Sequence, residues 1–429
     1  MIIHANDSGG RWRRLQAHFR QMFPAPFGLH TRHMFSAYLR DTLLVLGGVM
    51  IVALSIDLTA NLFDVIAANS DGSLLGKTLY LGWYILLRCV YFATELLPMA
   101  TFLGVFWAEV THTRSKNRLT VLIAGRSPSQ CLTPIILFAF LVASVQLALN
   151  IYLRPVAVMT QIEANLGLYG KIFDRRPSTK RKWIRTSDAL INARIEFTSP
   201  PMLHDLQVYR VGDDRRLHEV LEAKSAIPIA GEKKWLLRDG KRWVIAPRPA
   251  SNIIGPPQPQ EISILDEEKF AREEIALDVD PLWLRYFGVD VAYLPESVFR
   301  ALGTVKFYPD SEYRTWAQAR YALAVGAGGM AILAGGLSLL LLINGILLRS
   351  LVVIWTVGFA AHLLTKPLLQ LGFHGWIDPV LAAWFTPILI LLGPLVVYQA
   401  MKMRTPAIRS QRALDYGPVF HQRENPAPR

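Results

Sequence analysis

Two apolar segments decide the fold, LTPIILFAFLVASVQLALNIYL at residues 132–153 and YALAVGAGGMAILAGGLSLLLLINGILL at residues 321–348. Each is long enough to cross the hydrocarbon core of a bilayer, which takes about 20 apolar residues in a helix. The segment between them, residues 154–320, is rich in charged and turn-forming residues. We therefore predict two membrane-spanning helices with a separate domain inserted between them.

Four more apolar segments lie outward from this pair, residues 42–66 and 79–108 before it and residues 351–371 and 380–401 after it. Pro98 and Pro387 fall inside two of them, and prolines are tolerated in membrane helices because neighbouring groups satisfy the freed carbonyl. The whole chain is only 18% charged, whereas soluble domains carry about 25%. The sequence therefore predicts an α-helical membrane protein with three spans on each side of the inserted domain.

The basic residues that give the chain its net charge of +13 cluster beside the apolar segments. They lie before the first span, after the second, between the fourth and fifth, and after the sixth. Lys and Arg accumulate in the cytoplasmic loops of membrane proteins, so this pattern favours a topology signal over nucleic-acid binding. We expect a multi-pass protein of the bacterial inner membrane, with both termini in the cytoplasm and residues 154–320 in the periplasm.

The inserted segment has the residue pattern of β structure. Ala189–Phe197 and Leu206–Val211 are short runs of strand-forming residues, and two similar runs flank Asp239-Gly240 closely enough to predict a hairpin with a tight turn there. Several such strands predict an all-β, jellyroll-like sandwich. Residues 280–320 have a helical pattern that leads back to the membrane.

These features divide the chain into five parts. They are a basic cytoplasmic segment (1–40), spans one to three (41–153), the periplasmic β domain (154–320), spans four to six (321–401) and a cytoplasmic tail (402–429). Within the first part, Arg11–Phe23 has one apolar and one basic helical face. This pattern fits either a helix lying on anionic lipid or a plain basic topology anchor.

Ionisable residues inside spans are costly and usually face a protein interior or a water-filled cavity. The sequence has five of these residues, Asp57, Asp64, Arg88, Glu95 and Lys366. Arg88 and Lys366 lie near the expected periplasmic ends of their spans. They either extend toward lipid headgroups or form a basic rim that binds an anionic lipid, so both are candidate substrate-binding residues.

A short apolar run, RLTVLIAG at residues 118–125, lies between the second and third spans on the expected cytoplasmic side. It has basic flanks, is too short to span a bilayer, and ends in a glycine, which commonly terminates a helix. It is either an interfacial turn or a docking element for a soluble partner. The candidate docking residues are Asn117, Arg118, Leu119, Val121, Leu122 and Gly125.

No motif predicts catalysis, a metal site or a cofactor. Residues 71–78, DGSLLGKT, have part of a phosphate-binding loop, but Asp71 occupies the position of the first glycine and no strand precedes it. The two cysteines, Cys89 and Cys131, provide no zinc spacing or disulfide framework. We expect a protein that is not an enzyme and has no cofactor.

Four motifs resemble the permeases of lipopolysaccharide-export ABC transporters of the LptF/LptG type. They are Leu97-Pro-Met-Ala-x-x-Leu-Gly104, Leu119-Thr-Val-Leu-Ile-Ala-Gly-Arg-Ser-Pro128, Leu203-x-Asp-Leu-Gln-Val-Tyr-Arg210 and Asp378-Pro-x-Leu-Ala-Ala-Trp-x-x-Pro387. The third is more similar to the LptG branch. One departure is that the family usually opens its coupling helix with an acidic residue, where this chain has Asn117 or Arg118.

The resemblance implies a heterodimer with a homologous permease subunit, driven by a cytoplasmic ATPase dimer that carries out the hydrolysis. It also implies a periplasmic jellyroll that receives lipopolysaccharide and passes it to a bitopic bridge protein, and a lateral gate at the first and fifth spans. Two other classes of protein remain as alternatives. A permease of another lipid or lipoprotein exporter usually has its large domain after the first span, and a membrane-anchored periplasmic enzyme would need a catalytic group that the sequence lacks.

Overall fold

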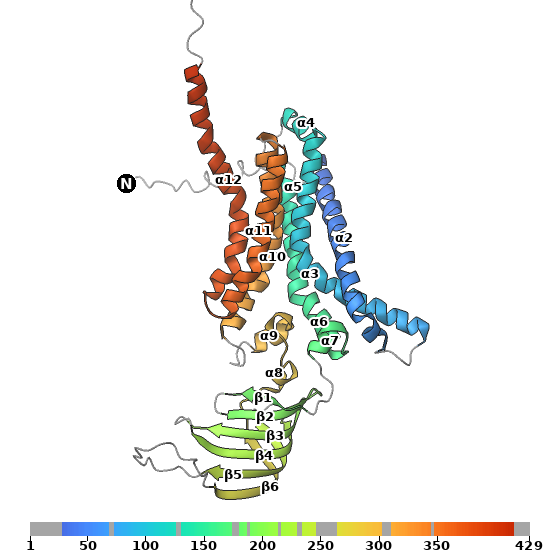
Figure 1. The fold of residues 1–429 in the computed structure, drawn as a ribbon, viewed down its shortest axis with the longest axis vertical. Coiled ribbons are helices and arrows are strands. Elements are labelled where there is room, and N and C mark those ends of the chain that lie inside the picture. The colour runs from blue at the N-terminus through green and yellow to red at the C-terminus, as the bar shows by residue number, and fades with distance from the viewer. Residues whose placement is uncertain are drawn as a thin grey trace, which may run out of the picture. The chain divides into compact units, whose positions relative to one another are not determined.

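The computed structural model describes residues 28–67, 73–125, 130–173, 180–186, 189–212, 216–229, 234–245, 264–302, 310–344 and 347–415 (Figure 1). The expected helix at Arg11–Phe23 and the aspartate at position 71 lie outside these residues. The chain divides into two compact units. The first comprises Met1–Ala53, Phe92–Asn150 and Arg314–Arg429, and the second comprises Leu54–Tyr91 and Ile151–Tyr313.

Six helices in the described part of the chain are long and apolar enough to cross a membrane. Five of them are α2 (Leu29–Ala67), α3 (Leu74–Arg114), α10 (Asp310–Asn344), α11 (Leu347–Phe373) and α12 (Pro379–Asp415). The third span joins η1 (Gln130–Leu132), α5 (Thr133–Ala148), the π-helical turn η2 (Leu149–Leu153) and α6 (Arg154–Glu163). This confirms the prediction of a helical membrane protein with three spans on each side of an inserted domain.

Helix α10 is the most enclosed span. Of its most apolar window, 67% is buried, whereas the corresponding window of α2 is 6% buried. Small residues allow this packing, because they let neighbouring helix backbones approach closely. A Cβ atom at Gly328 would lie 2.5 Å from the carbonyl oxygen of Ala139 in α5, and one at Gly336 would lie 2.8 Å from Pro394 in α12.

The inserted domain contains a six-stranded antiparallel sheet in which each strand pairs with the next along the chain. The strands are β1 (Lys182–Arg185), β2 (Ala189–Glu196), β3 (Met202–Val211), β4 (Leu217–Pro228), β5 (Lys234–Ile245) and β6 (Ile264–Ala276). This confirms the predicted β domain between the third and fourth spans. The described strands form one curved up-and-down sheet (Figure 1), whereas a sandwich would divide them between two sheets.

The hairpin predicted at Asp239-Gly240 is wrong. Strand β5 runs through both residues, and Gly240 pairs with Ala223 of β4 and Phe270 of β6. The pairing of β5 with β4 and with β6 therefore outweighs the local preference of Asp239-Gly240 for a turn. Asp239 has a positive φ of 50°, a backbone conformation common in turns. Gly240 is needed because a Cβ atom there would overlap the ring of Phe270.

Short helices precede and follow the sheet along the chain. Helix α7 (Gly167–Ile172) precedes β1, while α8 (Pro281–Arg285), η3 (Val291–Tyr293) and α9 (Glu296–Leu302) follow β6. The apolar side chains of the strands alternate, as in the burial pattern of β2, and form one buried face. Trp235 is fully buried on this face, and its indole N–H donates to the Val279 carbonyl at 3.2 Å.

Candidate functional site

A seven-residue helix, α4 (Asn117–Ile123), occupies the loop between α3 and the third span. It follows α3 after a turn in which Lys116 has a φ of 62°, and Gly125 ends it with a φ of 86° and an N–H bond to the Leu122 carbonyl. A positive φ at the residue after a helix is the geometry that favours glycine. The apolar run between the second and third spans is therefore a short helix.

Arg118 lies on the inner side of α4 and forms an ion pair with Glu109 of α3. Only 6% of the Arg118 side chain and 2% of the Glu109 side chain are exposed. The Tyr38 hydroxyl of α2 donates to the same carboxylate, and Arg118 Nη1 donates to the Ser338 carbonyl of α10 at 3.4 Å. The sequence predicted Arg118 as a docking residue for a soluble partner, but the structure places its charge inside the protein.

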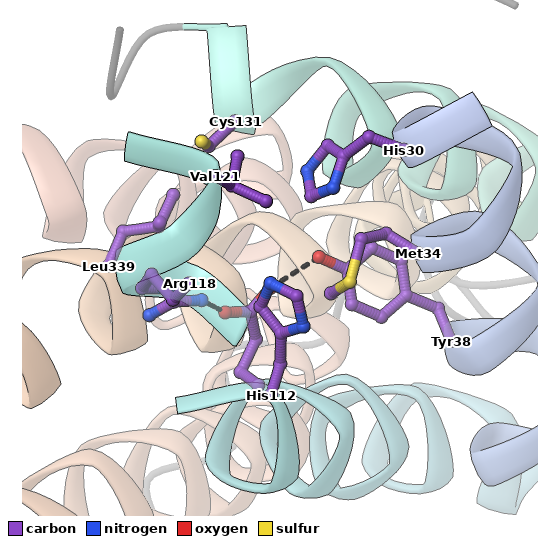
Figure 2. Close-up of a pocket in the computed structure, with 9 residues that line it drawn as sticks. His30, Met34, Tyr38, His112, Arg118, Val121, Cys131 and Leu339 are labelled. Carbon is purple, nitrogen blue, oxygen red and sulfur yellow. Dashed lines mark hydrogen bonds and ion pairs between the residues drawn. The ribbon is translucent and has the colours of Figure 1, made fainter. Parts of the chain in front are cut away.

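A small pocket adjoins this ion pair, and Figure 2 shows the side chains that surround it. The residues that line it are His30, Met34, Tyr38, Glu109, His112, Arg118, Val121, Cys131 and Leu339. The rings of His30 and His112 are 5.8 Å apart. Across the described residues, no group of three His, Cys, Asp or Glu side chains is placed to hold a metal ion.

The outer side of α4 carries two exposed apolar residues, Leu119 at 57% and Ile123 at 77% exposure. They are four residues apart, so they lie on the same helical face. Val121 and Leu122 are half-buried, while Asn117 and Gly125 are exposed. The docking residues named from the sequence include Leu119 and Leu122 but omit Ile123, although its spacing of four from Leu119 is visible in the sequence.

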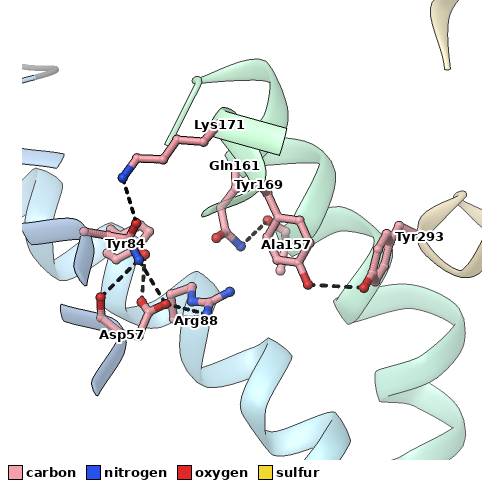
Figure 3. A network of polar contacts seen from close by, with 9 residues as sticks. Asp57, Tyr84, Arg88, Ala157, Gln161, Tyr169, Lys171 and Tyr293 are labelled. Atoms are coloured by element: carbon pink, nitrogen blue, oxygen red, sulfur yellow. Dashed lines mark hydrogen bonds and ion pairs between the residues drawn. The ribbon is translucent and has the colours of Figure 1, made fainter. Parts of the chain in front are cut away.

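Arg88 is buried in the second unit and forms an ion pair with Asp57, where its Nη2 lies 2.5 Å from the carboxylate. The Tyr84 hydroxyl donates to the same carboxylate at 2.7 Å, and the Asn61 amide donates at 3.3 Å (Figure 3). Tyr84 can approach Asp57 because Gly167, with a φ of 55°, has no side chain. A Cβ atom there would overlap the Tyr84 ring. In this conformation, the charge of Arg88 is balanced inside the protein.

Tyrosine rings and a second arginine surround Arg88. Its guanidinium lies 5.1 Å from the ring centroid of Tyr91 and 5.7 Å from that of Tyr169. The Arg154 guanidinium lies 5.3 Å from Tyr91 and 5.1 Å from Tyr293. Contacts of cations with ring faces at these distances are favourable. This stack joins α3 to α6, α7 and η3, so the structure assigns these residues a packing role that the sequence did not indicate.

Lys366 of α11 has an acidic partner in α3, with its Nζ 3.0 Å from Glu95 Oε2. The lysine side chain is 76% exposed and that of Glu95 is 26% exposed. A group outside this chain can therefore reach the ammonium of Lys366, whereas the guanidinium of Arg88 is enclosed on all sides.

Residues 36–400 match the family model described as "Lipopolysaccharide export system permease LptF/LptG". No curated protein matches the chain. The matched range includes the entire described sheet and all six membrane helices, apart from the start of α2 and the end of α12. The match does not distinguish the LptG branch from the LptF branch. Because the match extends over most of the sequence and agrees with the six-span architecture, the chain belongs to the LptF/LptG family of lipopolysaccharide export system permeases.

Proposed function

We propose that this chain is the permease subunit of an ABC transporter that extracts lipopolysaccharide from the inner membrane and passes it to a periplasmic bridge protein. The observation that carries this proposal is the family match over residues 36–400, which covers both the membrane helices and the inserted sheet. The chain has no complete ATP-binding motif. A separate cytoplasmic ATPase dimer supplies the energy, and a homologous permease completes a heterodimer in which this chain takes the LptG role.

The sidedness of the protein is part of the proposal. The distribution of Lys and Arg supports cytoplasmic termini and a periplasmic β domain. With this orientation, α4 lies on the cytoplasmic side, where an ATPase can reach it. The sheet lies in the periplasm, where the lipid leaves the membrane.

Lys366 is the residue we propose for contact with the substrate. Lipopolysaccharide carries phosphate groups, and a cation binds phosphate through charge-assisted hydrogen bonds. Its exposed ammonium can leave Glu95 for such a group. Arg88 would first have to break its buried ion pair with Asp57, so a contact of Arg88 with lipid requires a rearrangement of α3 against α2.

The exposed face of α4 is the docking element we propose for the ATPase. Leu119 and Ile123 offer an apolar pair that can enter a groove, as helix faces do in other complexes. Val121 and Leu122 are half-buried and lie between these two residues in the sequence, while Asn117 and Gly125 mark the two ends of the segment. Because Arg118 is turned inward, the charged rim of the docking face would come from Arg114 and Lys116, which are exposed.

Purification of the tagged chain from its native membranes tests the proposal. We expect a cytoplasmic ATPase, a second six-span permease and lipopolysaccharide to co-purify with it. The purified complex in lipid vesicles should release lipopolysaccharide to a soluble acceptor only when ATP is hydrolysed. A complex that binds ATPase but releases a different lipid would indicate another exporter, and a chain that purifies without ATPase would refute the proposal.

A further inference from the structure

The side chain of Arg118 attaches the inner side of helix α4 to the membrane helices. Its guanidinium forms an ion pair with Glu109 of α3 and donates to a backbone carbonyl of α10. Glu109 in turn accepts a hydrogen bond from Tyr38 of α2. One buried carboxylate and one buried guanidinium therefore connect α4 with the first, second and fourth spans.

We propose that Arg118 and Glu109 are a positioning pair that transmits a displacement of α4 to α2, α3 and α10. The inference deepens the proposed function and rests on it, because it takes α4 as the helix that the ATPase moves. Docking is assigned to the outer face of α4, at Leu119 and Ile123. Transmission is assigned to the inner face.

The burial of the pair is the first physical reason. A helix of seven residues has little stability of its own, so it keeps its place through its tertiary contacts. A buried charge that loses its partner is strongly unfavourable. When α4 moves, Arg118 therefore carries Glu109 with it or the pair breaks at high cost. An exposed pair would instead let α4 slide past α3.

The arrangement of the hydrogen bonds is the second reason. Tyr38 and Arg118 approach the Glu109 carboxylate from two different helices, so this group is held on two sides. The contact with α10 is made to the Ser338 carbonyl, a backbone group that no side-chain rotation can move away. Helix α10 is the most enclosed span, so its movement would shift the packed core of this unit.

The test compares Arg118→Met, Glu109→Gln and Arg118→Lys with the unchanged chain in the complete transporter. Three quantities are measured for each variant: the amount of ATPase that co-purifies, the rate of ATP hydrolysis, and the lipopolysaccharide released per ATP. Arg300→Met is a matched control, because it removes an exposed arginine from its ion pair with Glu296 in α9.

We expect Arg118→Met and Glu109→Gln to keep the ATPase and its hydrolysis, while the lipopolysaccharide released per ATP falls by roughly tenfold, a typical size for coupling between two sites. Arg118→Lys, which keeps the charge, should restore much of that ratio, and Arg300→Met should not change it. A general loss of folding would instead lower the amount of co-purified ATPase and the rate of hydrolysis together, and the molecules that remain would release the same amount of lipopolysaccharide per ATP.

Two results would overturn the inference. The first is an unchanged release per ATP in both Arg118→Met and Glu109→Gln, and the second is loss of the ATPase from these variants, which would make the pair a docking element. If neither variant accumulates, Tyr38→Phe is used, because it removes one hydrogen bond from Glu109 with little change in shape. An unchanged release of lipopolysaccharide per ATP in that variant would also overturn the inference. Failure of the proposed function would look different, because the unchanged chain itself would then release no lipopolysaccharide.

Discussion

Truncation of the exposed face of α4 is the sharpest test of ATPase docking. Full burial of a Leu or Ile side chain contributes about 2 kcal/mol. Leu119 and Ile123 are still 57% and 77% exposed, so a partner has most of this burial left to gain. The exposed fractions scale to about 1 kcal/mol for Leu119 and about 1.5 kcal/mol for Ile123. The double variant Leu119→Ala, Ile123→Ala should therefore bind the ATPase about 70-fold more weakly.

The assay is a titration of purified ATPase into the permease heterodimer held in lipid nanodiscs. The double variant should still assemble with its sister permease, because the membrane spans are unchanged. Leu190→Ala, an exposed apolar residue of β2, is the control and should leave the affinity unchanged. An affinity of the double variant within twofold of the original would refute the docking role of α4. It would direct the search to Arg349, near the start of α11, or to the C-terminal tail.

Three further predictions concern topology, substrate and stability. A cysteine at Lys241, in an otherwise cysteine-free chain, should react with a membrane-impermeant maleimide in intact spheroplasts, and labelling only after permeabilisation would contradict a periplasmic sheet. Lys366→Glu should reduce crosslinking to lipopolysaccharide whereas Glu95→Gln should retain it, and equal crosslinking in both would remove Lys366 from the substrate path. Gly167→Ala should lower the thermal midpoint more than Gly288→Ala, because both have a positive φ but only Gly167 abuts a tyrosine ring, which adds about 1–3 kcal/mol of overpacking. Equal midpoints would show that this contact relaxes freely.

The membrane part of the fold was predictable because lipid imposes a simple rule on sequence. A helix in hydrocarbon must be apolar over about 20 residues, and the six spans satisfy this rule without reference to any other part of the chain. The β domain was predictable only as a class. Asp239-Gly240 has the local pattern of a turn, but pairing with β4 and β6 decides its structure, and those partners are set by the whole sheet.

The site was less predictable because its contacts cross long stretches of sequence. Arg118 has a basic neighbourhood along the chain, which suggested an exposed flank. Its partners in space are Glu109, on the other side of a turn, and Ser338, on α10, which follows the β-sheet in the chain. Neither contact leaves a periodic signal. A buried ion pair in a membrane protein has to be found from structure, whereas an exposed apolar pair such as Leu119 and Ile123 can be found from spacing.

Three ion pairs between helices differ in how deeply they are buried, and this difference decides which roles their residues can have. Arg88 with Asp57 and Arg118 with Glu109 are buried on both sides, so each pair resists separation and holds its helices together. Lys366 with Glu95 is exposed on the lysine side, so a group outside the chain can reach this ammonium. We propose that the two enclosed pairs transmit force between helices and that Lys366 exchanges Glu95 for a phosphate group of the lipid.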